Sequence, residues 1–220
     1  MSAVGTSPNY ISKPSSRPPL PLPGFEHIDR YWDKTRGKYA AKIHPGELYV
    51  SNSGELVATV LGSCISACIR DPGMGIGGMN HFMLPKTNSG NVSATDVSCD
   101  SARYGNYAME ALINAIIRFG GAKERLEVKV FGGGKVMAKM SDIGMKNITF
   151  VHEYLELEGM KLLAEDTGGL HPRKVIYDPV SGKVGVKKLK VMHNDTIAER
   201  ETRYQSELET KPVAGEVDLF

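Results

Sequence analysis

A cysteine and a histidine lie in the first half of the chain at a spacing that allows nucleophilic chemistry. Cys64 follows the stretch Thr59-Val-Leu-Gly-Ser, and His81 comes 17 residues later, in Gly-Met-Asn-His-Phe-Met-Leu-Pro. A thiolate is the nucleophilic form of cysteine, and a neighbouring imidazolium lowers the pKa of the thiol. A hydroxyl such as that of Thr59 can accept a hydrogen bond from the second ring nitrogen and fix the tautomer of the histidine.

The elements expected around these residues would bring the two side chains together. The apolar pattern predicts three strands, Leu56–Ser63, Ile65–Asp71 and Gly77–Leu84. Gly62 permits a sharp turn between the first two, so Cys64 can lie at an exposed strand end. A hairpin-like return then allows His81 to meet it. The backbone N–H groups of Ser63 and Cys64, just after the glycine, could stabilise an oxyanion.

Spacing alone leaves other interpretations of these residues open. A buried cysteine is usually an inert, small apolar side chain, and a lone histidine near a strand is often structural. Cys68 is a rival nucleophile, although its place between Ala67 and Ile69 in the middle of an expected strand favours packing. Cys64, Cys68 and His81 do not form a zinc motif, because the sequence has neither CxxC nor HExxH.

Two glycine-rich stretches resemble nucleotide-binding motifs without meeting their requirements. Gly73, Gly75 and Gly78 fit GxGxxG, but the stretch follows Asp-Pro and leads into an expected strand rather than a helix, which favours a hairpin turn. The run Gly132-Gly133-Gly134-Lys lacks the first glycine and the Ser/Thr of a Walker A loop. The triplet still lets another backbone approach closely, so it could line a site as a wall for a substrate.

Composition limits the class of protein. The 220 residues include 41% hydrophobic and 24% charged residues, typical of a soluble globular protein, and a net charge of +2 gives no indication of nucleic-acid binding. The longest uncharged run, Leu56–Ile69, is too short and too polar to cross a bilayer, so we expect no direct membrane insertion. Three cysteines without a CxxC, and no secretion signal, favour the cytoplasm.

The chain divides into a central domain and two terminal segments. Residues 1–42 form an arm whose first 24 residues hold half of the twelve prolines, followed by an aromatic segment around Trp32 that should clamp the arm onto the domain. We expect a single central domain over 43–192, which would carry the candidate site. Residues 193–220 hold seven acidic and three basic residues, net −4, and read as a solvated acidic tail with a short helix at Thr196–Leu208.

The remaining elements give the fold class. The helical spacing of Ala102–Phe119 is strong, with Asp100 or Ser101 as the expected N-cap and Gly120 at the end. Further expected elements are a surface loop at Lys86–Cys99, a helix at Asn147–Glu158, and strands at Leu126–Phe131, Met160–Asp166, Lys174–Tyr177 and Val184–Leu189. Strands in groups with few crossover helices favour a mixed α+β sandwich.

The sequence resembles the CheD family, the chemoreceptor glutamine deamidases of bacterial chemotaxis. The string Leu-Gly-Ser-Cys64, with the His81 segment 17 residues later, carries the likeness. It continues in order over about residues 40–190, through the following blocks: Ala102-Arg-Tyr-Gly105, Lys129-Val-Phe-Gly-Gly-Gly134, Asp142-Ile-Gly-Met-Lys-Asn147, Asp166-Thr-Gly-Gly169, Pro172-Arg-Lys174 and Gly182-Lys-Val-Gly-Val-Lys-Lys188.

The resemblance implies a fold, a site and a reaction. The fold is an α/β/β sandwich similar to cysteine hydrolases of the cytotoxic necrotizing factor type, and the site is Cys64, His81 and Thr59. Some family members place the threonine one residue farther from the cysteine, so the hydroxyls of Ser63 and Ser66 must be distinguished from it.

The implied reaction is deamidation of glutamines on the helical cytoplasmic part of methyl-accepting chemotaxis receptors, through a thioester and without cofactor or metal. An alternative is a regulatory module that acts mainly by binding the chemotaxis phosphatase CheC, which family members can bind. Intact Cys64 and His81 favour the enzyme. A thiol hydrolase acting on small amides fits less well, because an extended protein substrate fits the family.

Overall fold

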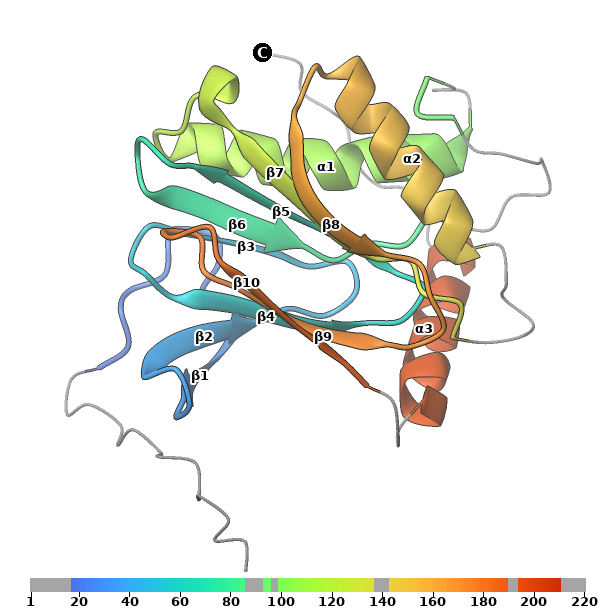
Figure 1. Cartoon of the computed structure of the whole chain (residues 1–220), viewed down its shortest axis with the longest axis horizontal. Helices are drawn as coiled ribbons and strands as arrows, with labels where there is room; N and C mark the ends of the chain where they lie inside the picture. The colour runs from blue at the N-terminus through green and yellow to red at the C-terminus, as the bar shows by residue number, and fades with distance from the viewer. Residues whose placement is uncertain (1–16, 86–92, 96–98, 137–142, 190–193, 211–220) are drawn as a thin grey trace, which may run out of the picture.

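Two five-stranded sheets lie face to face, and two helices cover the outside of one of them (Figure 1). The computed structural model describes residues 17–85, 93–95, 99–136, 143–189 and 194–210. We call the sheet next to the helices, in the order β3-β6-β5-β7-β8, the central sheet, and the other, in the order β1-β2-β4-β9-β10, the outer sheet. This is an α+β layered arrangement, as the grouping of strands and helices predicts. Its helix layer over two sheets is the α/β/β order that the resemblance implies.

The chain passes from one sheet to the other before β3, β4, β5 and β9. The outer sheet contains β1 (Asp29–Asp33), β2 (Lys38–Lys42), β4 (Leu56–Leu61), β9 (Arg173–Tyr177) and β10 (Val184–Lys188). The central sheet contains β3 (Leu48–Ser51), β5 (Ile65–Asp71), β6 (Ile76–Asn80), β7 (Glu127–Gly132) and β8 (Leu162–Thr167). Neighbouring strands are antiparallel except for the β2–β4 and β7–β8 pairs. The chain therefore crosses between sheets directly after β4, which is where the candidate nucleophile lies.

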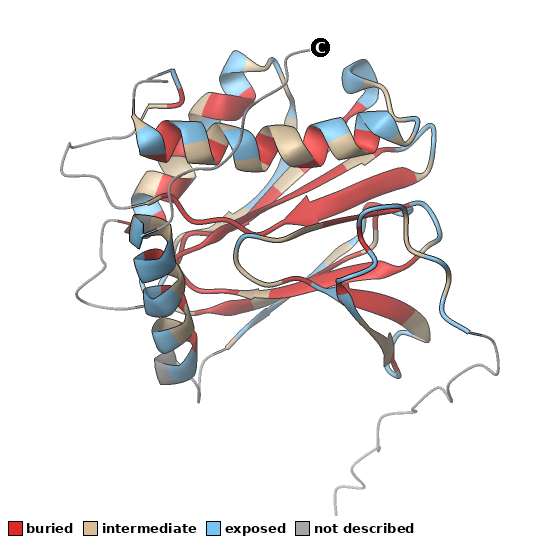
Figure 2. Ribbon diagram, turned by 180° about the vertical axis from the view of Figure 1, so that it is seen from behind, coloured by how far each residue is buried: buried red, intermediate tan, exposed pale blue. Residues whose placement is uncertain are grey.

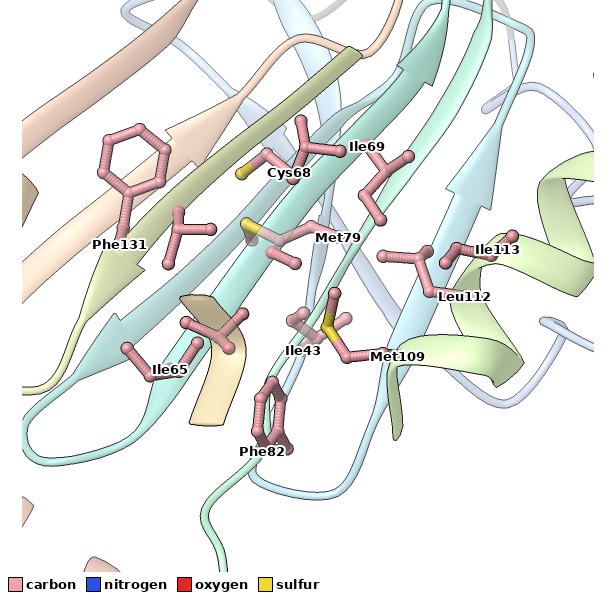
Figure 3. Packing of buried hydrophobic residues seen from close by; sticks show 14 of the residues in the cluster. Ile43, Ile65, Cys68, Ile69, Met79, Phe82, Met109, Leu112, Ile113 and Phe131 are labelled. Atoms are coloured by element: carbon pink, nitrogen blue, oxygen red, sulfur yellow. The ribbon is translucent and has the colours of Figure 1, made fainter. Parts of the chain in front are cut away.

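The core lies on both faces of the central sheet. Every residue of β6 is buried, and β5 is buried except at Arg70, as the red strands of Figure 2 show. One apolar cluster includes Met79, Cys68 and Ile69 of this sheet together with Met109 and Leu112 of the helix layer (Figure 3). Full burial of such side chains contributes about 1.5–3 kcal/mol each. The strands that flank the site are thus held rigidly.

Helix α1 (Asp100–Arg118) confirms the strongest helical pattern in the sequence, with one difference at its start. Its N-cap is Cys99, which makes no side-chain capping bond. The two residues expected to cap the helix are engaged elsewhere: Ser101 Oγ donates to the carbonyl of Pro85, and Asp100 pairs with Arg103. At the other end Gly120 adopts φ +105° and its N–H donates to Ile117, as expected of a terminating glycine. The expected cap at Asp100 or Ser101 is therefore wrong.

The other helices are longer than the sequence pattern indicates. Helix α2 (Ile143–Leu157) begins four residues before the expected start at Asn147, and a short 3-10 turn, η1 (Lys123–Arg125), precedes β7. Helix α3 (Asn194–Thr210) spans the helix expected at Thr196–Leu208. Among the described residues, no helix combines the length and apolar character needed to cross a membrane.

The segment expected to be an aromatic clamp forms regular structure as well. Strands β1 and β2 pair with each other and β2 joins β4, so residues 29–42 belong to the outer sheet. The aromatic packing is present: the rings of Trp32 and Tyr39 lie 5.2 Å apart, and Phe25 contacts Tyr49 at 5.5 Å. The division of the chain into an arm with its clamp at 1–42, a domain at 43–192 and a tail at 193–220 stays a prediction. Residues 1–16 and 211–220, and most of the loop expected at Lys86–Cys99, lie outside the described residues.

The expectation of a fully solvated tail is wrong for the described part of the C-terminal segment. On α3, Ile197, Glu201 and Gln205 are buried. These residues share one face of the helix because they are spaced four apart. Figures 1 and 2 both show α3 standing at one end of the two sheets, apart from the layer formed by α1 and α2.

Candidate active site

The crossing segment Gly62–Cys64 carries the chain from β4 in the outer sheet to β5 in the central sheet. Its glycine is required for a different reason from the sharp turn expected. Gly62 does not adopt a positive φ. Instead, a Cβ on Gly62 would lie 2.8 Å from both carboxylate oxygens of Glu201, a residue of α3. Glycine is needed there because a carboxylate approaches the backbone closely.

All three carbonyl groups of the crossing segment are hydrogen-bonded by neighbouring residues. The N–H of Gly133 donates to Cys64 O at 2.8 Å, and the N–H of Gly134 donates to Gly62 O at 2.7 Å. The side-chain amide of Asn147 on α2 donates to Ser63 O at 2.8 Å. With the carbonyls fixed in this way, the N–H groups of the segment are left for another partner.

The glycine triplet after β7 therefore supports the crossing segment. Gly132 adopts φ +118°, and a Cβ there would lie 2.1 Å from Cys64 O. Gly132, Gly133 and Gly134 are all buried. The triplet makes its contacts with the crossing segment, whereas the sequence suggests a wall for a substrate.

The N–H groups of the crossing segment converge on one carboxylate. Glu201 Oε1 accepts from the N–H of Gly62 at 2.9 Å and from that of Cys64 at 3.3 Å. Glu201 Oε2 accepts from the N–H of Ser63 at 2.9 Å and from its hydroxyl at 2.7 Å. We call these three N–H groups the anion cradle. The expected donors, Ser63 and Cys64, belong to it, and Gly62 adds a third.

His81 lies one residue beyond β6 and is oriented by Thr59 on β4. The Thr59 hydroxyl donates to Ile43 O at 2.8 Å, and Thr59 Oγ1 lies 2.8 Å from His81 Nδ1. Because the only hydroxyl proton is engaged with Ile43, Thr59 must accept from Nδ1–H. The tautomer is thereby fixed with Nε2 unprotonated. His81 Nε2 is buried and has no hydrogen-bond partner among the described residues.

The strand register places Cys64 and His81 on the same side of the chain crossing. Ile65 and Phe82 form an antiparallel bridge with both of their N–H···O bonds at 2.9 Å. The residues flanking a bridge pair point to the opposite face from the pair itself, so Cys64 and His81 share a face at diagonal positions. Both side chains are buried, with exposed fractions of 0% and 2%.

The electrostatics of this arrangement differ from the expected thiolate–imidazolium pair. Burial, with smaller contributions from nearby His44 and Arg200, lowers the pKa of His81 to about 3. Burial and the adjacent Glu201 carboxylate raise the pKa of Cys64 well above its ordinary value. Both groups are therefore neutral near pH 7. The physical reason is that α3 covers the site and adds a negative charge beside the thiol.

The alternative residues in the sequence have other partners. The Ser63 hydroxyl bonds Glu201, and the Ser66 hydroxyl donates to the carbonyl of Asn80, so neither replaces Thr59 beside His81. Cys68 lies in the apolar cluster of Figure 3, and burial raises the pKa of its thiol. Among the described residues, no group of three or more His, Cys, Asp or Glu side chains could hold a metal ion.

One cavity of about 390 Å³ lies beside His81 and Thr59, with His44, Lys174 and Arg200 among its other lining residues. A larger cavity, of about 990 Å³, lies between α1 and the segment around Phe25 and does not include the candidate site. Of these two cavities, only the smaller reaches the histidine, so it is the more relevant to chemistry.

Sequence reasoning missed Glu201. It is one of seven acidic residues after position 192, and nothing in its neighbourhood distinguishes it from the others. The sequence indicates Asn147 only as part of a family block and as the start of an expected helix, without a role at the site. Both act through contacts between residues far apart in the chain, which a local pattern cannot reveal.

Comparison with known proteins places the chain in a family. The family model for CheD, described as CheD chemotactic sensory transduction, matches residues 83–188. A protein of Hahella chejuensis named probable chemoreceptor glutamine deamidase CheD is 54% identical over 212 residues, covering 96% of this chain and 100% of that protein. Proteins with the same name from Halorhodospira halophila and Methylobacillus flagellatus are 50% and 51% identical, covering 90% and 86% of this chain and 93% and 94% of their own lengths. The chain belongs to the CheD family.

Proposed function

We propose that this protein is a protein-glutamine deamidase that converts glutamine side chains of chemotaxis receptors to glutamate. The named relatives, each about half identical over most of the chain, support the activity and the receptor as substrate. The observation in the structure that carries the proposal is the anion cradle. Three backbone N–H groups at the candidate nucleophile already hold an anion, as the oxyanion of acyl transfer requires.

In the proposed first step, Cys64 attacks the carboxamide carbon of a bound glutamine. His81 Nε2 takes the thiol proton as sulfur forms its bond to carbon, which is why the unprotonated Nε2 is needed. The amide oxygen becomes an oxyanion held by the cradle of Gly62, Ser63 and Cys64. The protonated His81 then gives its proton to the departing nitrogen, the C–N bond breaks, and ammonia leaves a thioester on Cys64.

In the second step, water restores the enzyme. His81 Nε2 removes a proton from the water as its oxygen adds to the thioester carbon. The C–S bond breaks, the proton returns to the Cys64 sulfur, and glutamate is released. Thr59 is a positioning residue, because it holds Nδ1–H and so presents Nε2 throughout both steps. Apart from the substrate and one water molecule, these two steps use only groups of the chain.

The proposal assigns the glycine triplet and Asn147 to support of the cradle. Gly133, Gly134 and Asn147 bind the carbonyl oxygens of the crossing segment, so they set the direction of its N–H groups without touching substrate. This role replaces the substrate wall suggested by the sequence.

We further propose that the substrate glutamines lie on the helical cytoplasmic part of the receptors and that the reaction takes place in the cytoplasm. The three free cysteines, Cys64, Cys68 and Cys99, suit a reducing compartment. A regulatory contact with CheC is compatible with this activity. A purely regulatory role would require neither a free imidazole nitrogen nor an anion cradle beside a thiol, which favours the enzyme.

Mass spectrometry of a receptor cytoplasmic fragment tests this function. Incubation with the protein should convert specific glutamines to glutamate, each raising the fragment mass by about 1 Da. The same fragment incubated alone, or with His81→Ala, should keep its mass. A fragment that keeps its mass after incubation with correctly folded wild-type protein would contradict the proposal.

A further inference from the structure

The face that α3 turns toward the two sheets is unusual for a docked helix. Its buried residues include the polar Glu201 and Gln205, with exposed fractions of 2% and 1%, besides the apolar Ile197. Glutamate is almost never fully buried unless it is paired. Here the pairing is supplied by the anion cradle, so the docking of α3 depends on a carboxylate more than on apolar packing.

The position of Glu201 matches that of a reaction product. Deamidation of a glutamine leaves a glutamate whose carboxylate lies at the cradle, with its carbon beside the thiol. Glu201 is a glutamate side chain on a helix, its Oε1 accepts from the N–H groups of Gly62 and Cys64, and its carboxylate lies close enough to Cys64 to help burial raise the pKa of the thiol. No space is left above Gly62 for a second carboxamide, because the carboxylate lies in van der Waals contact with this residue.

We propose that α3 is a built-in competitor of the substrate: Glu201 occupies the active site as a mimic of the glutamate product, and α3 must leave before a substrate glutamine can bind. This inference rests on the proposed function, because it uses the cradle and Cys64 as the reacting centre. It adds a regulatory element that belongs to the chain itself.

The contacts around Glu201 show how α3 could be both specific and releasable. Tyr204, one turn further along, packs against Gly46 and hydrogen-bonds Tyr104 of α1, which sets the register of the helix. Gln205, by contrast, is buried with neither of its amide atoms paired among the described residues. A buried polar group without a partner weakens the docked state. A receptor helix that docks in the same place without burying an unpaired amide there would therefore compete successfully with α3.

The first test compares full-length Glu201→Ala with wild type. If α3 is docked for about nine-tenths of the time, the apparent affinity for substrate is reduced about tenfold. Glu201→Ala should then lower KM for a receptor fragment about tenfold and leave kcat within about twofold. It should also accelerate alkylation of Cys64 by iodoacetamide at pH 7, because the thiol loses both its cover and the adjacent negative charge. The matched control is Glu199→Ala, which removes an exposed charge from the same helix.

The two readouts separate this inference from the proposed function. Faster alkylation of Cys64 in Glu201→Ala, without turnover of the receptor fragment by either protein, would support α3 as a cover and contradict the deamidase proposal. Turnover by wild type with unchanged KM and unchanged alkylation in Glu201→Ala would overturn the competitor role of α3 and leave the deamidase intact.

A second variant tests the mimicry directly. Glu201→Gln places a carboxamide where the carboxylate lies, so the chain should deamidate its own residue 201 by adding water and releasing ammonia. Peptide mapping should show residue 201 returning to glutamate, a gain of about 1 Da, and the double variant with Cys64→Ser should keep the glutamine. If the glutamine at 201 persists in protein that converts a receptor fragment, residue 201 does not occupy the substrate position and the proposal fails.

Discussion

Replacing Thr59 by valine removes the hydroxyl that orients His81 while keeping the shape of the side chain. The hydroxyl makes two buried hydrogen bonds, one to Ile43 O and one with His81 Nδ1, both at 2.8 Å. Valine leaves the Nδ1–H and the carbonyl without a partner in a site where Thr59 itself is only 4% exposed.

The size of the effect follows from the lost preference for one tautomer. A buried donor left without its acceptor costs about 1–3 kcal/mol, and each 1.4 kcal/mol corresponds to about a tenfold change in rate. The imidazole can avoid this cost by moving its proton to Nε2, where it can no longer act as the base. We therefore expect Thr59→Val to lower kcat about ten- to a hundredfold, with a small change in KM.

The assay is deamidation of a receptor fragment followed by mass spectrometry, with Thr59→Ser as the matched control. Serine retains a hydroxyl able to bridge Ile43 and His81, so it should keep most of the wild-type rate. A Thr59→Val protein that is folded and as active as wild type would refute the assignment of Thr59 as the residue that fixes the tautomer.

Three further predictions concern the framework. Asp71 is buried and accepts backbone N–H bonds, and its pKa is held well below the usual range by Arg125, so Asp71→Ala should lower the free energy of unfolding by about 2 kcal/mol at pH 7. Because its folded pKa is depressed, this difference should be present above about pH 4 and vanish as the pH falls further, and urea titrations that show no such pH dependence would contradict it. Phe25→Ala should lower the thermal midpoint through a loss of about 3 kcal/mol, and an unchanged midpoint would mean that this ring does not anchor the N-terminal segment. Asn147→Ala should reduce kcat more than it raises KM, because the carbonyl of Ser63 loses its donor. An unchanged kcat would mean that the bond from α2 does not help to orient the cradle.

The sequence predicts the parts of the site that depend on local pattern. The spacing of Cys64 and His81 around a glycine-rich turn correctly indicates two adjacent strands, and the observed turn between β5 and β6 confirms the hairpin interpretation of Gly73–Gly78. The hydroxyl expected at Thr59 does lie beside the second ring nitrogen of His81. These expectations succeed because strand alternation and a short return strongly restrict where the side chains can point.

The sequence fails where contacts are distant or strands are short. Strands β1 and β2 are each five residues long and carry charged or aromatic side chains, so their pattern resembles a clamp more than a sheet edge. The acidic character of the last 28 residues suggests solvation, yet Glu201 is buried because the cradle satisfies its charge. The raised pKa of the Cys64 thiol is likewise invisible in the sequence, because it comes from burial and from a carboxylate that lies 137 residues away in the chain.

The most direct test of the account compares two buried thiols, Cys64 in the crossing segment and Cys68 on β5. Deamidation of a receptor fragment should be measured for Cys64→Ser and Cys68→Ser, with circular dichroism to show that both proteins are folded. We expect Cys64→Ser to lose activity by about a thousandfold or more, and Cys68→Ser to stay within about threefold of wild type, because Cys68 only fills space in the core. Loss of turnover in folded Cys68→Ser, with turnover retained in Cys64→Ser, would contradict the assignment of Cys64 as the nucleophile.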